Sequence, residues 1–110
     1  MKKINLDHVP NCGGSIVSKN ILDGKGRLKW CVRDEPINDV DNGWRFFSDI
    51  DTEEFLNSAN NMQVVSWNSM VQIEPAILAI FELPIGSDLE FSEFKGEKHF
   101  YDTISGKKVI

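Results

Sequence analysis

The side chains best suited to catalysis or metal binding are few and scattered in this sequence. His8 and His99 lie near opposite ends of the chain, and Cys12 and Cys31 form no Cys-x-x-Cys pair. A zinc site needs donors clustered at short, fixed spacings, so we predict no metal. A nucleophilic Cys12 would need a histidine beside it as a base, and nothing in the local sequence pattern positions one there.

Two short stretches resemble ligand-binding loops only superficially. Residues 39–43 look like the start of a calcium loop, but such a loop needs an Asp or Asn where Gly43 stands and a Glu where Ile50 stands. The glycines at 24 and 26 lack the third glycine of a dinucleotide fingerprint, and no Gly-Lys-Ser or Gly-Lys-Thr is present. We therefore predict no catalytic residues and no cofactor.

Charge is distributed unevenly along a chain whose formal net charge is −5. Basic residues outnumber acidic ones within residues 1–33, whereas Arg45 is the one basic residue among the many acids of residues 34–54. An acidic surface argues against nucleic acid as the ligand and favours a positively charged protein partner. A second interpretation is a solvated face that only keeps the protein soluble. The sequence leaves both interpretations open.

The predicted partner-binding residues lie in this acidic segment. Trp44 is expected to begin a strand beside Arg45, and tryptophan and arginine next to carboxylates are common in interface hot spots. Arg45 could instead pair internally with Asp39 or Asp41. The predicted set is Asp34, Glu35, Asp39, Asp41, Trp44, Arg45 and Asp49.

Hydrophobic patterns predict an α+β fold, a small and mostly antiparallel sheet packed with two or three short helices. Residues 44–48 and 62–65 have the character of central strands, and residues 89–94 and 99–103 that of a closing hairpin. Helical spacing over residues 67–81 is interrupted at Glu74-Pro75, because proline lacks the backbone donor and restricts the residue before it. Core burial is expected for Trp67.

An N-terminal hairpin is the firmest local prediction. Residues 15–22 and 27–33 should pair around Asp-Gly-Lys-Gly, whose glycines supply the positive backbone angles of a tight turn. In that register Cys12 lies well beyond Cys31, so no disulfide is expected. Alternation places three residues of the second strand on one face, which should be core. They are Leu28, Trp30 and Val32.

Three further segments are expected between and after these strands. Residues 52–58 should form a short helix with Asp51 as its N-cap and Glu54 as the capping-box partner. Residues 34–43 contain a proline, asparagines and several acids, which favours an exposed loop. Residues 105–110 are expected to be loose.

Length and apolar content bear on domain number and location. A chain of 110 residues has the usual size of one domain, so we predict a single domain over residues 1–110. The longest apolar run, residues 75–81, is far shorter than a membrane span requires. Polar residues interrupt any secretion signal near the start. These features predict a cytoplasmic protein without membrane contact.

Several motifs resemble one bacterial family. They are Ile-Val-Ser-Lys-Asn-Ile-Leu at 16–22, Arg-Asp-Glu-Pro at 33–36, Asp-Asn-Gly-Trp-Arg-Phe-Phe-Ser at 41–48, Ile-Glu-Pro-Ala-Ile at 73–77 and Pro-Ile-Gly-Ser at 84–87. Together they resemble the family described as domain of unknown function 2185, and also as immunity protein family 33 of polymorphic toxin systems. The similarity runs from about Ser15 to Phe91.

The resemblance implies an α+β fold and the neutralisation of a cognate protein toxin by tight binding in the cytoplasm. It supplies no catalytic residues. An acidic inhibitor would suit a basic toxin such as a nuclease, because complementary charge accelerates association. The oligomeric state stays open between a monomer and a weak homodimer. The alternative is a small-molecule-binding or regulatory domain with a pocket lined by aromatic residues, and a third interpretation is a hydrolase.

Overall fold

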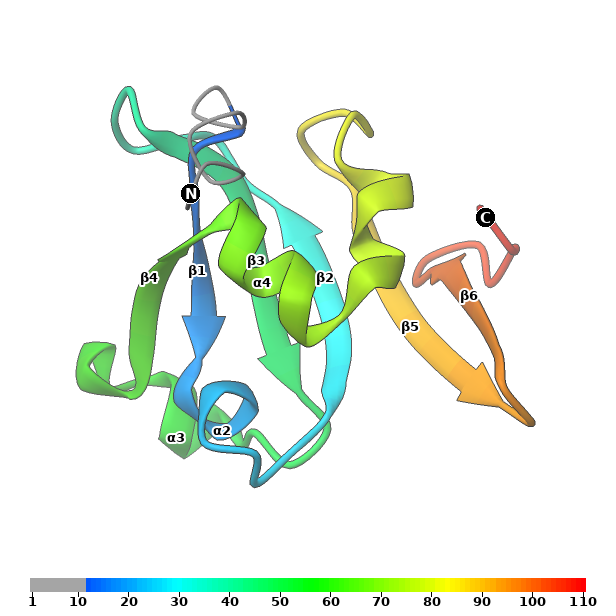
Figure 1. Cartoon of the computed structure of the whole chain (residues 1–110), viewed down its shortest axis with the longest axis horizontal. Helices are drawn as coiled ribbons and strands as arrows, with labels where there is room; N and C mark the ends of the chain where they lie inside the picture. Colours follow the sequence, from blue (N-terminus) through cyan, green and yellow to red (C-terminus); the bar gives the residue numbers. More distant parts are fainter. Residues whose placement is uncertain (1–11) are drawn as a thin grey trace, which may run out of the picture.

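The computed structural model describes residues 12–110, which form one six-stranded mixed sheet and several short helices (Figure 1). The strands are β1 Gly14–Ser18, β2 Leu28–Arg33, β3 Asp41–Ser48, β4 Met62–Ser66, β5 Asp88–Phe94 and β6 Glu97–Asp102. The helices are α2 Lys19–Leu22, α3 Glu53–Leu56 and α4 Trp67–Ile73, with 3-10 helices η2 Ala59–Asn61 and η3 Pro75–Ile80. This architecture confirms the predicted α+β class with a mostly antiparallel sheet.

The strand order β4-β1-β3-β2-β5-β6 shows that the predicted N-terminal hairpin is wrong. Strand β3 lies between β1 and β2, parallel to β1 and antiparallel to β2. The cause is a helix start within the first predicted strand. The Ser18 hydroxyl accepts a hydrogen bond from the backbone N–H of Asn20, so the chain leaves the sheet and forms α2.

The predicted core face of β2 is also partly wrong, because the register of β2 against β3 shifts between Leu28 and Trp30. An irregularity of this kind moves the following residues to the other face of a sheet. Leu28 and Cys31 are therefore buried in the core, whereas Trp30 is 37% exposed. Both Cys12 and Cys31 are free.

The C-terminal half follows the prediction more closely. Helix α4 ends at Ile73, η3 begins at Pro75, and Trp67 is buried. Strands β5 and β6 form the closing hairpin around Lys95 and Gly96, which both have positive φ angles. The tail is not loose as predicted, since Val109 N donates to Phe100 O at 2.7 Å.

Thr52, and not Asp51, caps α3, since the Thr52 hydroxyl accepts from Phe55 N. The Asp51 carboxylate instead accepts hydrogen bonds from Ser18 Oγ, from Asn20 Nδ2 and from the N–H and Oγ of Ser48. It therefore joins the start of α2 to the end of β3.

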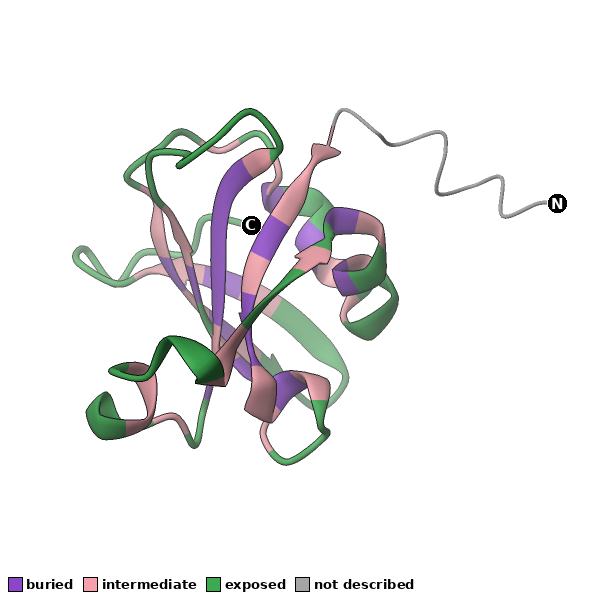
Figure 2. Ribbon diagram, turned by 90° about the vertical axis from the view of Figure 1, so that its left-hand side faces the viewer, coloured by how far each residue is buried: buried purple, intermediate pink, exposed green. Residues whose placement is uncertain are grey.

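The hydrophobic core lies on one face of the sheet, beneath α4 and η3. Figure 2 shows these helices gathered on one side of the strands. A row of register partners, Val17, Phe46, Cys31 and Leu89, runs across four strands and belongs to this core. Trp67, Met70, Ile77 and Ile80 cover it from the helices.

Candidate interaction surface

The predicted partner-binding acids do not form one surface. Asp34, Glu35 and Asp39 are exposed in the loop that joins β2 to β3, at one end of the sheet (Figure 1). Asp49 follows the far end of β3, where its carboxylate accepts a hydrogen bond from Arg27 N. An eight-residue strand is about 26 Å long, so Asp49 lies apart from the others.

Asp41 and Arg45 form a nearly buried ion pair. Both guanidinium nitrogens Nη1 and Nη2 of Arg45 donate to the Asp41 carboxylate at 2.8 Å, and the Asp34 carboxylate lies 3.6 Å from Nε. The Arg45 side chain is 8% exposed. The hydrogen bond from Arg45 holds the pKa of Asp41 well below its usual range, with further bonds from Gly43 N and Ile37 N opposing the effect of burial. This pair fixes to the sheet the loop between β2 and β3, residues 34–40, which we call the acidic loop.

Trp44 is fully buried, so its ring is not available to a partner protein. It stacks on Phe46 with ring centroids 6.2 Å apart, and its Nε1 donates to Phe81 O. Arg33, its register partner on β2, lies over the rings of Trp44 and Phe81 and donates to the carbonyls of Phe81 and Leu83. These contacts join the end of η3 to the sheet.

Asn42 and Gly43 organise the same end of the sheet. The Asn42 carbonyl oxygen Oδ1 accepts from Ser15 Oγ and Trp44 N, while Nδ2 donates to Cys12 O. Gly43 has φ of +90°, and a Cβ at this position would meet Asp34 O at 2.3 Å. The Asp-Asn-Gly-Trp-Arg motif therefore has a structural role, which is to hold the acidic loop in place.

The face of the sheet opposite the core carries a separate set of residues. Cross-strand partners point to the same face, so the register defines two neighbouring rows. The first row is Val64, Ile16, Arg45, Val32 and Asp88, and the second is Phe47, Trp30, Glu90 and Tyr101. We call these nine residues the open sheet face.

The open sheet face is partly apolar and bordered by acids. Trp30 and Val64 are exposed, and Ile16, Val32 and Phe47 are half-buried. Because Asp34 reaches Arg45, the acidic loop borders this face at one end. The alternation of apolar residues predicts Trp30 in the core. It does not predict the shift in β2 register that exposes Trp30.

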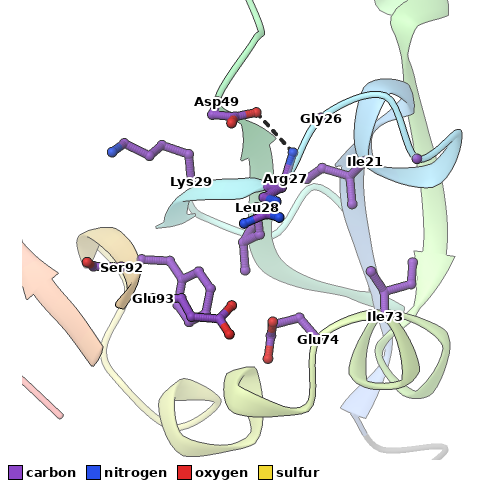
Figure 3. Close-up of a pocket in the computed structure, with 12 residues that line it drawn as sticks. Ile21, Gly26, Arg27, Leu28, Lys29, Asp49, Ile73, Glu74, Ser92 and Glu93 are labelled. Atoms are coloured by element: carbon purple, nitrogen blue, oxygen red, sulfur yellow. Dashed lines mark hydrogen bonds between the residues drawn. The ribbon is translucent and has the colours of Figure 1, made fainter. Parts of the chain in front are cut away.

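A cavity of about 580 Å³ lies away from the open sheet face, beside the C-terminal end of α4 (Figure 3). Glu74 and Glu93 lie on one side of it and Arg27 on another, with Ile73 and Leu28 also lining it. Glu74 accepts hydrogen bonds from Ala76 N and Lys98 Nζ, so its carboxylate is already partnered. Among the lining residues only Asp49 belongs to the predicted set.

Two further properties hold for the described part of the chain. Residues 12–110 contain no group of three or more His, Cys, Asp or Glu side chains placed to hold a metal ion. No helix in the same range has the length and apolar character needed to cross a membrane.

Fold and surface together define a small α+β domain with helices on one face of its sheet and a partly apolar, acid-bordered opposite face. The family described as immunity protein Imm33 domain matches residues 15–101, and the chain belongs to this family. The match extends the similarity seen in the motifs through most of β6. No curated protein and no solved structure matches the chain.

Proposed function

We propose that this protein is an immunity protein that binds a cognate protein toxin and neutralises it by covering the toxin's active surface. Membership of the immunity protein Imm33 domain family is the observation that carries the proposal. Binding alone accounts for this role, so the protein acts without catalysis or cofactor, in the cytoplasm where the toxin would otherwise act.

The toxin would contact the open sheet face together with the acidic loop, residues 34–40. Trp30 is the exposed aromatic side chain of this face, and buried tryptophans are frequent hot spots once a partner covers them. Asp34, Glu35 and Asp39 would attract a basic toxin, such as a nuclease, because the loop projects their carboxylates into solvent. Trp44, Arg45 and Asp41 would act indirectly, by holding the loop in position.

The test is co-expression with the product of the neighbouring gene as the candidate toxin. Wild-type protein should restore growth, and the Trp30→Ser variant and the triple variant Asp34→Lys, Glu35→Lys, Asp39→Lys should protect poorly. The matched control reverses three exposed acids at the other end of β3, Asp49, Glu53 and Glu54, and should protect fully.

The outcomes separate the role from the surface. Failure of the wild type to protect against the toxin would refute the immunity role. Full protection by both Trp30→Ser and the triple variant would leave the role intact but remove the proposed surface.

The cavity beside α4 favours a second function, the binding of a small molecule. Its volume is within the usual range of ligand pockets, and Arg27 on its rim could pair with an anionic ligand, whereas Lys29 is paired with Glu90 at 2.7 Å. Small anionic metabolites that raise the melting temperature of the wild type, but not of an Arg27→Ala variant, would support this function. A melting temperature that no such compound changes would count against it.

A further inference from the structure

The two edges of the sheet differ in how they are protected. Beyond β6, the tail pairs with the edge, since Tyr101 bridges to Lys108 and Val109 N donates to Phe100 O. Beyond β4, no segment within residues 12–110 adds a further strand, because β4 ends the strand order and pairs with β1 alone. Figure 2 looks onto this edge, where β4 crosses in front of the buried strands.

Strand β4 lacks the features by which natural edge strands usually avoid pairing, such as a charged side chain, a proline or a bulge. Its sequence is Met-Gln-Val-Val-Ser, and its register with β1 is continuous over five residue pairs. Val64 at its centre is 67% exposed. The strand is therefore able to accept another strand along its outer edge.

The segment that contains β4 is uncharged, although the chain contains 12 Lys and Arg and 17 Asp and Glu residues. No charged residue occurs within residues 55–73, which include η2, β4 and α4. Strand β4 itself offers no acid to a basic toxin. For a second copy of the chain, with the same net charge of −5, this neutral edge is where two molecules meet with least repulsion.

We propose that two copies of the chain pair through β4, antiparallel, about a two-fold axis at Val64. In this register Met62 opposes Ser66 of the second copy, and Val64 opposes Val64. Residues that oppose each other in this register are both even-numbered or both odd-numbered. Along a strand, the backbone N–H and C=O groups of even-numbered and odd-numbered residues point to opposite edges, so the outer-edge groups of one copy meet the outer-edge groups of the other. The pairing joins two six-stranded sheets into one.

The expected dimer is weak. A contact along a five-residue edge buries less than the roughly 1,200 Å² that stable interfaces need. The contact shares Val64 with the open sheet face, whereas Trp30 lies on β2 and the acidic loop precedes β3, both outside β4. A dimer would consequently offer two toxin-binding surfaces.

Sedimentation equilibrium over a concentration series tests the proposal on the full chain without toxin. Wild type should self-associate, and Val64→Lys and Val64→Glu should each weaken dimerisation by about tenfold or more, because like charges would face each other at the axis. An equimolar mixture of the two variants should recover association, since Lys then opposes Glu. Ile104→Lys, an equally drastic change at an exposed residue beyond β6, should dimerise as wild type does.

Three results would overturn the proposal. They are a wild type that stays monomeric up to about 1 mM, a Val64→Lys variant that dimerises normally, and a mixture that associates no better than either variant alone. A monomeric wild type whose Val64→Lys variant fails to bind the toxin would assign Val64 to the toxin-binding surface instead. The exposure of Val64 means that its variants should retain the wild-type melting temperature, which circular dichroism verifies.

Discussion

At the scale of single residues, the Asp-Asn-Gly-Trp-Arg motif makes mostly internal contacts. Its polar groups bond to Cys12, Ser15 and each other, and its tryptophan is in the core. If the proposed surface binds the toxin, this motif would maintain its shape without touching the partner. Substitutions within it should therefore change stability first and binding second.

Gly43→Ala should lower the free energy of unfolding by about 2 kcal/mol or more. The added Cβ meets Asp34 O, and the φ of +90° is unfavourable for any residue with a side chain. Urea denaturation measures the change. Gly24→Ala is the matched control, because Gly24 also has positive φ but has nothing within 4 Å of the added carbon. Equal losses in the two variants would show that the close approach to Asp34 is unimportant.

The Asp41–Arg45 pair predicts a specific dependence of stability on pH. The folded protein lowers the pKa of Asp41, so the stabilisation is complete above the unfolded pKa of roughly 3.9 and is lost as the pH falls toward the folded pKa. The free energy of unfolding should consequently decrease between about pH 5 and pH 2.

Asp41→Asn tests this assignment. It should destabilise the protein by about 2 kcal/mol at pH 7, because Arg45 is left nearly buried without its main carboxylate. It should also flatten the decrease in stability toward low pH, as seen in urea denaturation at several pH values. Glu35→Gln, a change at an exposed loop acid, should keep the wild-type profile. An Asp41→Asn variant with an unchanged slope would contradict the assignment.

At the scale of secondary structure, the sequence located most elements but paired the first ones wrongly. The strands around 28–33, 44–48 and 62–65 and the helix break at Pro75 have local signals in apolar spacing and in proline chemistry, and the structure confirms them. Pairing between distant strands has no comparable local signal. Asp-Gly-Lys-Gly suited a hairpin turn, but the chain forms α2 immediately before it.

The same limitation applies to the candidate surface. Acids are concentrated in residues 34–54 of the sequence, but sequence distance does not show that β3 carries Asp49 to the opposite end of the sheet. The exposure of Trp30 depends on an irregular register between two strands, and only the three-dimensional pairing reveals it.

Asp51 illustrates how one carboxylate can join two elements. Burial alone would raise the pKa of Asp51, but hydrogen bonds from Ser48, Asn20 and Ser18 outweigh it and the pKa is lowered. Asp51→Ala should therefore reduce the free energy of unfolding by about 2 to 3 kcal/mol, since several charge-assisted hydrogen bonds are lost at once.

Thr52→Ala provides the comparison for Asp51→Ala. It removes only the N-cap hydrogen bond of α3 and should cost about 1 kcal/mol. Thermal or urea denaturation of both variants ranks the two residues. A larger loss for Thr52→Ala would show that the N-cap of α3 stabilises the fold more than the bridge made by Asp51.

At the scale of the whole molecule, the proposed partner surface predicts a salt-dependent association rate. The acidic loop would steer a basic toxin, and salt screens such attraction over about 8 to 10 Å at 0.1 to 0.15 M ionic strength. The association rate constant should fall as salt increases, and stopped-flow mixing with catalytically inactive toxin measures it.

The triple charge-reversal variant of Asp34, Glu35 and Asp39 should associate about tenfold more slowly than wild type at low salt and approach the wild-type rate at high salt. The dissociation rate should change less, since the three carboxylates are solvated. A rate constant that does not depend on salt in the wild type would exclude steering by this loop.

The position of β3 between β1 and β2 also determines when folding can begin during synthesis. The sheet partners of β1 are β3 and β4, and those of β2 are β3 and β5, all of them later in the sequence. The nascent chain consequently has no strand pair to form until residues 41–48 have left the ribosome. Until then the apolar side chains of the first two strands stay unpaired, as binding sites for chaperones.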